Sequence, residues 1–214
     1  MNIILFGPPG AGKGTQGDFL AKNFNLIKIS TGDLLRREIK KKSSLGNEIK
    51  STIDKGMFVS DKVVNDLIND VVLEKKNFNK MIFDGYPRNI FQAEFLDSMI
   101  KKNNQNISCV LNINVDQDVI IKRILGRQIC SNCGNIFNKF YNPANSEKHR
   151  CDIKYLKTRS DDTEDTIKKR YKTYEKITFP IIKYYQDQNL LFNVNGMAKI
   201  TEINKEISGF IKRL

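Results

Sequence analysis

A glycine-rich loop stands near the start of the chain, between a short apolar run and a helical pattern. The run Ile3–Phe6 is followed directly by Gly7-Pro8-Pro9-Gly10-Ala11-Gly12-Lys13-Gly14-Thr15. Glycines let a backbone turn tightly and point successive N–H groups inward, and the helix that follows adds its own free N–H groups. Lys13 supplies a cation for the outer phosphates of a nucleotide. We therefore predict a phosphate-binding loop for a nucleoside triphosphate, in which Gly14 moves the usual hydroxyl one place on, to Thr15.

The order of the apolar patterns predicts an α/β fold, a P-loop parallel β-sheet core flanked by helices. Five runs are typical of buried strands: Ile3–Phe6, Leu26–Ile29, Met81–Phe83, Cys109–Val115 and Leu190–Val194. Between them, apolar residues recur at helical spacing over 63–72 and 91–99, and a late helix over 167–185 should kink or break near Pro180. Ligands of such sheets bind beyond the carboxyl ends of the strands, where the glycine-rich loop lies.

Two stretches interrupt this alternation and are predicted to be insertions. Residues 30–59 hold helical patterns with no strand between them, and residues 126–162 contain cysteines, aromatic residues and short strand-like runs. We expect a core of residues 1–29, 60–125 and 163–214, with a helical insertion at 30–59 and a small β-rich insertion at 126–162. A chain of 214 residues is long enough for one substantial core with such lobes.

The amino-acid composition indicates where the protein is located and which kinds of partner it can bind. A hydrophobic content of 40% and a charged content of 28% are typical of a soluble globular protein, and no apolar run approaches the length of a membrane span. The first strand begins without the charged segment of a signal peptide, so we expect a cytoplasmic protein with no membrane partner. A net charge of +12 also fits nucleic-acid binding, but the lysines are scattered over many helical patterns, and we expect no nucleic-acid partner.

A second polar site follows the third strand-like run. Met81–Phe83 ends in Asp84, and an Asp at this place in phosphate-loop enzymes holds the magnesium ion, directly or through water. The next residues, Gly85-Tyr86-Pro87-Arg88, predict a fixed loop from which Arg88 projects beside the nucleotide. Gln92 follows in the first turns of the next helix.

Six arginines form a set that we interpret as functional: Arg36, Arg88, Arg123, Arg127, Arg159 and Arg170. Phosphoryl transfer spreads negative charge over the migrating group, and fixed guanidinium groups offset that charge through paired hydrogen bonds. Arg123 and Arg127 are four residues apart and share one helix face. A single arginine of this kind would be read as a solvated surface residue, but several of these flank the 126–162 insertion on both sides.

Four motifs together make the chain similar to the adenylate kinase family of the long-lid bacterial type. They are Gly7–Gln16 (GPPGAGKGTQ), Ser30–Arg36 (STGDLLR), Phe83–Arg88 (FDGYPR) and Arg159–Asp162 (RSDD), with Arg123 and Arg127 at the family's place. The resemblance covers essentially the whole chain. It implies a reversible transfer that converts ATP and AMP into two ADP, an AMP-binding lobe at 30–59, a lid over ATP at 126–162, and a monomeric enzyme.

The resemblance also implies which residues bind each nucleotide. On the ATP side it points to Gly10, Ala11, Gly12, Lys13, Gly14, Thr15, Arg123 and Arg127, with Ile136, Phe137 and Ala198 beside the base. On the AMP side it points to Thr31, Arg36, Met57, Phe58, Val59, Gly85, Tyr86, Pro87, Arg88, Arg159, Arg170 and Gln92, of which Gln92 would read the adenine edge. The implied catalytic group consists of Lys13, Arg88, Arg123, Arg127, Arg159 and Arg170. Asp84 would hold the Mg²⁺ that accompanies ATP, through water.

The lid sequence carries a pattern of metal ligands. Cys130 and Cys133 form a C-x2-C pair, and His149, Cys151 and Asp152 follow about 16 residues later. In a cytosolic protein this pattern indicates structural zinc rather than a disulfide. Counted back from the RSDD motif, His149 and Asp152 fall at the family's usual ligand places. Because thiolates and imidazole suit zinc better, we favour Cys130, Cys133, His149 and Cys151; Asp152 as the fourth ligand and a lid without metal are the alternatives.

Two rival functions share some of these features. The first is another nucleoside monophosphate kinase, or a variant that uses GTP as donor. The second is a phosphate-loop ATPase that binds nucleic acid through a zinc ribbon and a basic surface. ATP-dependent formation of ADP from AMP, without stimulation by DNA or RNA, distinguishes the predicted enzyme from both.

Overall fold

The centre of the fold is a five-stranded parallel sheet, in a computed structural model that describes residues 1–55, 57–145, 147 and 149–214. The strands lie in the order β2-β3-β1-β4-β8, and they are β1 (Asn2–Phe6), β2 (Ile27–Ser30), β3 (Met81–Asp84), β4 (Ile107–Asn114) and β8 (Leu191–Asn195). All five begin and end within two residues of the predicted bounds. Because β1 pairs with both β3 and β4, the loop that follows it opens at the middle of the sheet.

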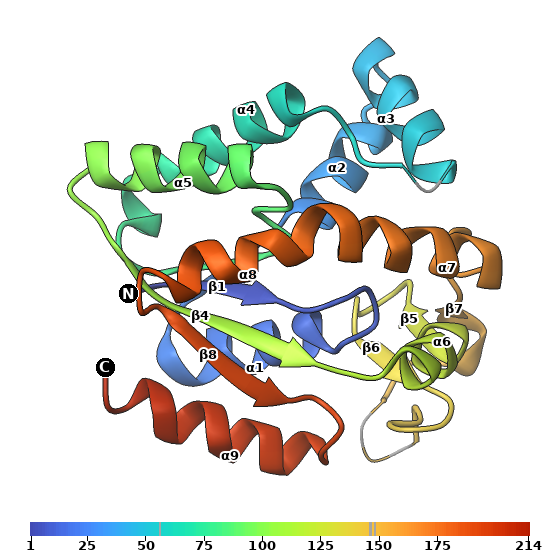
Figure 1. The fold of residues 1–214 in the computed structure, drawn as a ribbon. Helices are drawn as coiled ribbons and strands as arrows, with labels where there is room; N and C mark the ends of the chain where they lie inside the picture. The colour runs from blue at the N-terminus through green and yellow to red at the C-terminus, as the bar shows by residue number, and fades with distance from the viewer. Residues whose placement is uncertain (56, 146, 148) are drawn as a thin grey trace.

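Alternate residues of β1 show how helices cover both faces of this sheet. Ile3 and Leu5 are buried in one cluster with side chains of α1 (Lys13–Phe24), α6 (Gln117–Leu125) and α9 (Ile200–Ile211). Ile4 and Phe6 are buried in the other, with α4 (Asp61–Val72), α5 (Ile90–Lys102) and α8 (Phe179–Gln186). Figure 1 shows α1 and α9 below the sheet and α4, α5 and α8 above it. Burial on both faces explains why the inner strands β1, β3 and β4 are mostly apolar, whereas the edge strands β2 and β8 are less buried and carry polar residues such as Lys28 and Asn193.

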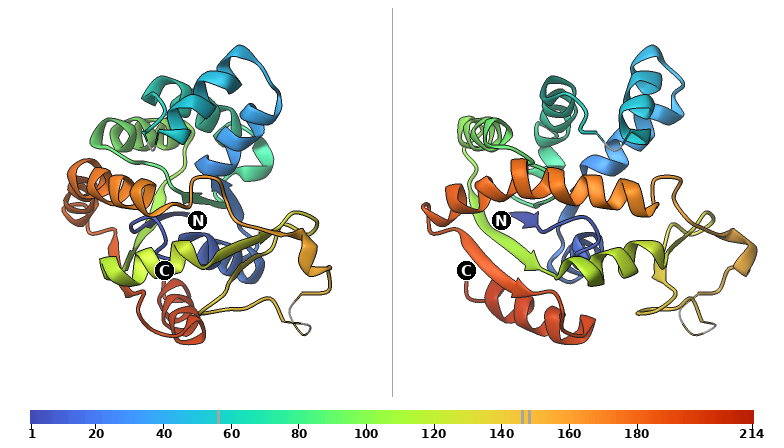
Figure 2. Two further views of the ribbon diagram at one scale, coloured as in Figure 1. Left: turned by 90° about the vertical axis from the view of Figure 1, so that its right-hand side faces the viewer. Right: turned by 45° about the vertical axis from the view of Figure 1, so that its right-hand side comes forward.

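The two predicted insertions differ in structure as expected. Residues 31–54 form α2 (Thr31–Lys40) and α3 (Ser44–Asp54), and the described part of 31–59 contains no strand. The second insertion holds a small antiparallel sheet of order β6-β5-β7, made of β5 (Arg127–Cys130), β6 (Ile136–Asn138) and β7 (Leu156–Lys157), with the short 3-10 helix η2 (Ile153–Tyr155). Both insertions project beyond the end of the main sheet toward which its strands point (Figures 1 and 2).

The long late helix, predicted to kink or break near Pro180, contains a π-helical turn just before that residue. It consists of α7 (Glu164–Thr173), a π-helical turn η3 (Tyr174–Thr178) and α8, and Pro180 lies in the first turn of α8. The wider turn continues directly into α8, and the backbone N–H of Phe179 donates to the carbonyl oxygen of Tyr174, five residues earlier. The remaining short helix is η1 (Lys75–Asn77), between α4 and β3.

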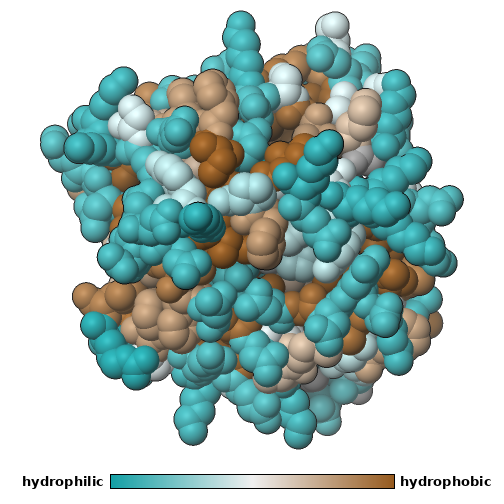
Figure 3. Space-filling view, viewed as in Figure 1, coloured by the Kyte–Doolittle hydropathy of each residue, from teal (hydrophilic) through white to brown (hydrophobic). Residues whose placement is uncertain are grey.

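Hydrophilic side chains cover most of the face seen in Figure 3, and apolar ones appear there in small separate groups. In the described part of the chain, none of the helices has both the length and the apolar character that a membrane span requires.

Candidate active site

A cavity of about 370 Å³ gathers residues from the core and from both insertions. Its wall includes most of the residues predicted from the sequence: Gly10, Ala11, Gly12, Lys13, Gly14, Thr15, Arg36, Met57, Phe58, Val59, Asp84, Gly85, Pro87, Arg88, Arg123, Arg127, Ile136, Phe137, Arg159, Arg170 and Ala198. The glycine-rich loop follows β1, and Asp84 is the last residue of β3. Because these two strands are neighbours in the sheet, the loop and Asp84 lie side by side. Side chains more than 100 positions apart therefore face one space.

The glycine-rich loop has the backbone that its sequence predicts. Gly10 and Gly12 have φ of 84° and 100°, values that other residues rarely adopt. A Cβ on Gly10 would lie 2.7 Å from Cγ1 of Ile124, so the loop also packs closely on α6. Lys13 Nζ donates to the carbonyl oxygens of Gly7 at 2.7 Å and Pro8 at 2.9 Å. Burial lowers the pKa of Lys13 to about 8, which makes an anionic ligand beside it favourable.

Arg88 is held in place from several sides. Its Nε donates to the carbonyl oxygen of Gly85 at 2.8 Å, and its guanidinium carbon lies 4.8 Å from the ring centre of Phe58. Its backbone N–H donates to Oε1 of Gln92 at 2.8 Å, and its carbonyl oxygen accepts from the hydroxyl of Thr178 at 2.9 Å. Gln92 belongs to α5 and Thr178 to the π-helical turn before α8, so these two elements and Phe58 of the first insertion hold Arg88 at the cavity wall.

The arginines of the cavity repel one another. Burial, followed by repulsion from Arg170, lowers the pKa of Arg88 to about 10. Burial, followed by repulsion from Arg127 and Arg36, lowers the pKa of Arg159 to about 10. The Nε of Arg159 is buried and has no hydrogen-bond partner in the part of the chain that the structure describes. Cations gathered away from water in this way are stabilised by a multiply charged anion such as a polyphosphate.

Carboxylates and carbonyl groups orient the other arginines. Arg127 forms a two-pronged ion pair with Asp162, with Nε 2.8 Å from Oδ2, and the Asp162 side chain is only 2% exposed. Arg170 Nη2 lies 2.6 Å from Oδ2 of Asp161. These two acidic residues of the RSDD motif thus hold two of the predicted catalytic arginines at the cavity wall.

Arg123 and Arg36 are held differently. Arg123 donates to the carbonyl oxygen of Gly196 at 2.8 Å, and its guanidinium carbon lies 5.4 Å from the ring centre of Tyr141. Arg36 pairs with Asp33, one turn earlier on α2, at 2.6 Å. Arg123 therefore connects the core loop before α9 with the lid, whereas Arg36 stays within the first insertion.

Three predicted AMP-binding side chains are not on the cavity wall formed by the described residues. Tyr86 is a core residue with no exposed surface, and its hydroxyl donates to Oδ1 of Asn65 at 2.6 Å. The hydroxyl of Thr31 donates to the carbonyl oxygen of Gly85 at 2.8 Å. Gln92 is 3% exposed, and both ends of its amide are hydrogen-bonded within the protein. These three side chains therefore lie directly behind the wall of the cavity, and their part in binding AMP stays a prediction.

Sequence reasoning missed several residues of the site. Thr178 and Tyr141 line the cavity and contact Arg88 and Arg123, respectively. Phe58 was expected beside a base, and it lies against a predicted catalytic arginine as well. Hydroxyls and rings are common in any helix or loop, so only the fold could show that these face the cavity.

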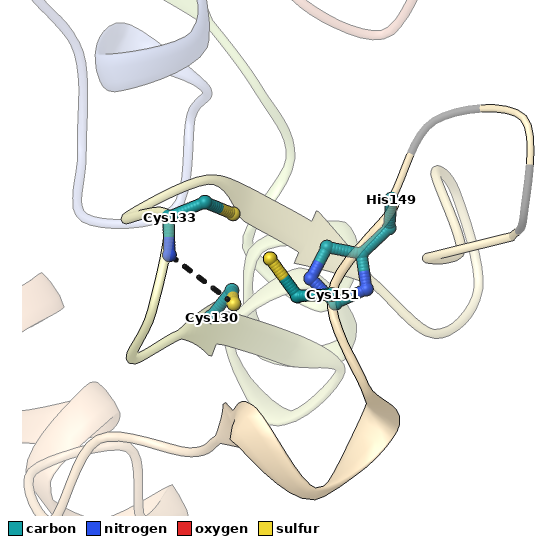
Figure 4. A group of neighbouring side chains, drawn as sticks. All are labelled: Cys130, Cys133, His149 and Cys151. Atoms are coloured by element: carbon teal, nitrogen blue, oxygen red, sulfur yellow. Dashed lines mark hydrogen bonds between the residues drawn. The ribbon is translucent and has the colours of Figure 1, made fainter.

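The lid brings together the favoured set of metal ligands. One ligand atom from each of Cys130, Cys133, His149 and Cys151 lies within 4.8 Å of the others. Figure 4 shows the imidazole ring of His149 facing the thiols, and its buried Nε2 has no hydrogen-bond partner among the described residues. Burial raises the pKa of Cys130, but hydrogen bonds from the Cys133 backbone and from His149 lower it overall to about 6, toward the thiolate that binds metals. Three thiols and one imidazole suit zinc.

The alternative ligand Asp152 lies outside this cluster. Its Oδ1 accepts from the backbone N–H of Lys154 at 2.8 Å, which caps η2, and its Oδ2 lies 3.3 Å from the Lys154 ammonium. An exposed carboxylate with a capping role of its own has no need of a metal. The cluster that could hold zinc is therefore the one with Cys151.

One cavity thus joins a phosphate-binding loop, apolar side chains of the first insertion and six arginines, a set suited to binding nucleotide phosphates and bases. The class of protein that this fold and site define is the nucleoside monophosphate kinases. Comparison with known proteins narrows the class. The sequence profile of the family described as "Adenylate kinase" matches residues 5–190. The chain belongs to the adenylate kinase family.

Relatives that match this chain over nearly their full length are also named adenylate kinase. An adenylate kinase of Pelagibacter ubique is 41% identical over 212 residues, which cover 99% of this chain and 100% of the relative. An adenylate kinase of Clostridium botulinum is 41% identical over 215 residues, which cover 100% of this chain and 99% of the relative. An adenylate kinase of Caldicellulosiruptor bescii is 42% identical over 209 residues, which cover 97% of this chain and 97% of the relative. The enzyme is thus a phosphotransferase that converts ATP and AMP into two ADP, and members of this family use Mg²⁺ with ATP.

Proposed function

We propose that the cavity holds ATP and AMP together, with ATP on the glycine-rich loop and AMP between Arg88 and the first insertion. The observation that carries this proposal is that one cavity joins Lys13, Arg88 and the apolar segment Met57–Val59. In this assignment the Gly10–Thr15 backbone and Lys13 bind the ATP phosphates. Ile136, Phe137 and Ala198 contact the donor base. Arg36, Gly85, Pro87 and Arg88, with Met57, Phe58 and Val59, bind AMP.

The reaction proposed for this site needs charge neutralisation more than proton transfer. An oxygen of the AMP phosphate, already ionised, attacks the γ-phosphorus of ATP, and the bond from that phosphorus to the β,γ-bridging oxygen breaks. Lys13, Arg88, Arg123, Arg127, Arg159 and Arg170 offset the charge of the migrating group. Asp84 is assigned to the Mg²⁺ that accompanies ATP, through water. Of the residues behind the wall, Thr31 and Tyr86 fix the position of the loop that carries Arg88, and Gln92 contacts the base once AMP has bound.

We also assign the two insertions as lobes that close over the nucleotides, 30–59 over AMP and 126–162 over ATP. Closure excludes water, which would otherwise compete with AMP for the phosphoryl group. A monomeric state, a cytoplasmic location and the absence of nucleic-acid and membrane partners stay predictions from the sequence. The division of the cavity is tested by replacing Lys13 and Arg88 separately, since each change should weaken the binding of a different substrate.

We infer that the lid cluster binds structural zinc through Cys130, Cys133, His149 and Cys151. A lid of 37 residues, counted over 126–162, has little core of its own, and a metal cross-link would stabilise it. The buried Nε2 of His149, which has no hydrogen-bond partner in the part of the chain that is described, supports this assignment, because a buried ring nitrogen otherwise finds one.

Metal analysis tests the lid site. We expect about one zinc per chain and a lower melting temperature after chelation, because binding free energy of a structural zinc adds to folding free energy. Cys151→Ser should lose the metal, whereas Asp152→Asn, the matched control at the neighbouring position, should keep it. The proposed ligand set is wrong if the purified protein contains no zinc. It is also wrong if Cys151→Ser keeps the zinc and Asp152→Asn loses it.

A further inference from the structure

A chain of hydrogen bonds behind the cavity wall begins at a residue with no assigned role, Asp61. Oδ1 of Asp61 accepts from Nε2 of Gln92 at 2.6 Å, and its Oδ1 and Oδ2 accept from Nδ2 of Asn89 at 2.9 and 3.0 Å. Oε1 of the same Gln92 side chain accepts from the backbone N–H of Arg88 at 2.8 Å. The Gln92 amide is therefore bonded at both ends, to the start of α4 and to the loop that carries Arg88.

These partners fix which way round the amide lies. A carboxylate can only accept a hydrogen bond and a backbone N–H can only donate one, so the NH₂ group must face Asp61 and the oxygen must face Arg88. Turned over, the amide would place its oxygen against a carboxylate and its NH₂ against an N–H group, losing both bonds in a buried site. In this orientation one N–H and one oxygen lone pair of the Gln92 amide have no hydrogen-bond partner among the described residues.

A fixed donor and acceptor distinguish purine bases. Adenine has an acceptor at N1 and a donor at its 6-amino group, whereas a 6-oxopurine has a donor at N1 and an acceptor at O6. An amide that can turn over pairs with either edge, but one held in a single orientation pairs with only one of them. A mismatched pair leaves buried polar groups without partners, which is the strongest source of discrimination between similar substrates.

We propose that Asp61 sets the preference of the acceptor site for adenine over 6-oxopurines by fixing the orientation of the Gln92 amide. The inference rests on the proposed function, in which Gln92 contacts the base once AMP has bound. Asp61 is a positioning residue: it lies behind Gln92 and acts through it. Its place at the first position of α4, directly after the first insertion, ties the base-reading side chain to the end of the lobe that binds AMP.

The test compares AMP with inosine monophosphate, whose base differs from adenine at positions 1 and 6 only. Asp61→Asn replaces an acceptor-only group by an amide that also donates, so we expect the ratio of kcat/KM for AMP to that for inosine monophosphate to fall roughly tenfold. Asp61→Glu keeps an acceptor-only carboxylate and should retain most of the preference. Asp66→Asn, an exposed carboxylate on the same helix, is the matched control and should behave as the unmodified enzyme.

Three results would overturn the inference: an unchanged ratio in folded Asp61→Asn, an equal loss of activity on both acceptors, or a change in KM for ATP as large as that for AMP. Gln92→Ala separates this failure from failure of the proposed function. If Gln92→Ala lowers the preference and Asp61→Asn does not, only the role of Asp61 is wrong; if neither changes it, the base contact of Gln92 is wrong as well. If Asp61→Asn does not fold, the kcat/KM ratio is compared between Asp61→Gln and Asp61→Glu, whose side chains have the same length. The ratio should then fall in Asp61→Gln and not in Asp61→Glu.

Discussion

Replacement of Arg88 by alanine is expected to lower kcat by roughly 10²–10³-fold, because a fixed donor aimed at developing charge in a water-poor site has an effect of this size. Its side chain is held by Gly85 and Phe58 on the wall of the cavity, so contacts within the protein orient the guanidinium. Preorganisation of this kind acts on the transition state more than on substrate binding. We expect KM for AMP to rise and KM for ATP to change little.

The Arg88→Ala variant should fold normally. The hydrogen bonds that tie this position to Gln92 and Thr178 use its backbone N–H and carbonyl groups, which alanine retains. Loss of a buried cation from a group of mutually repelling arginines also removes an unfavourable interaction. Arg37→Ala, at an exposed arginine on α2, is the control and should leave the rate unchanged. A normal kcat in Arg88→Ala would remove this residue from the proposed catalytic group.

Replacement of Lys13 by alanine should act on the other substrate. We expect kcat/KM for ATP to fall roughly 10²–10³-fold, since the variant loses the cation that the glycine-rich loop presents to the outer phosphates. The backbone N–H groups of the loop stay in place, so some ATP binding should persist. Lys22→Ala, an exposed lysine near the end of the same helix, is the control. Initial rates with each nucleotide varied in turn measure both effects.

The pH dependence of the unmodified enzyme gives a second readout for Lys13. Burial lowers its pKa to about 8, so the ammonium form predominates below that pH and the neutral amine above it. Because kcat/KM reports the free enzyme, kcat/KM for ATP should decline as pH rises above about 8, whereas kcat should not, since bound phosphates favour the charged form. A decline above pH 8 that persists unchanged in Lys13→Ala would assign the titration to another group.

The parts of the fold that local pattern determines were predictable from sequence. The inner strands β1, β3 and β4 are buried on both faces, so their short apolar runs stand out between helical patterns. The glycine-rich loop was recognisable because its spacing and its lysine are set by the phosphate it binds. The six arginines were predicted as a set, and all six line the cavity. Only Arg36, Arg88 and Arg159 lie within the four motifs, and Arg127 begins β5 instead of sharing a helix face with Arg123.

The direction of individual side chains was not predictable. The motif around Arg88 gave the right loop, but Tyr86 turns into the core because Asn65 on α4 offers its hydroxyl a buried partner. Gln92 is likewise held by Asp61 from a segment 31 positions earlier. In the lid, counting from the RSDD motif favoured Asp152, whereas the chain brings Cys151 to the cluster and leaves Asp152 to cap η2. Such choices depend on long-range packing, which a short motif does not record.

The products formed from ATP, AMP and Mg²⁺ test the central claim most directly. We predict that purified protein forms two ADP for each ATP consumed, that no ADP accumulates without AMP, and that DNA or RNA has no effect on the rate. Equal amounts of ADP and inorganic phosphate formed from ATP alone, or a rate stimulated by polynucleotide, would contradict the assignment of the cavity to phosphoryl transfer between two nucleotides.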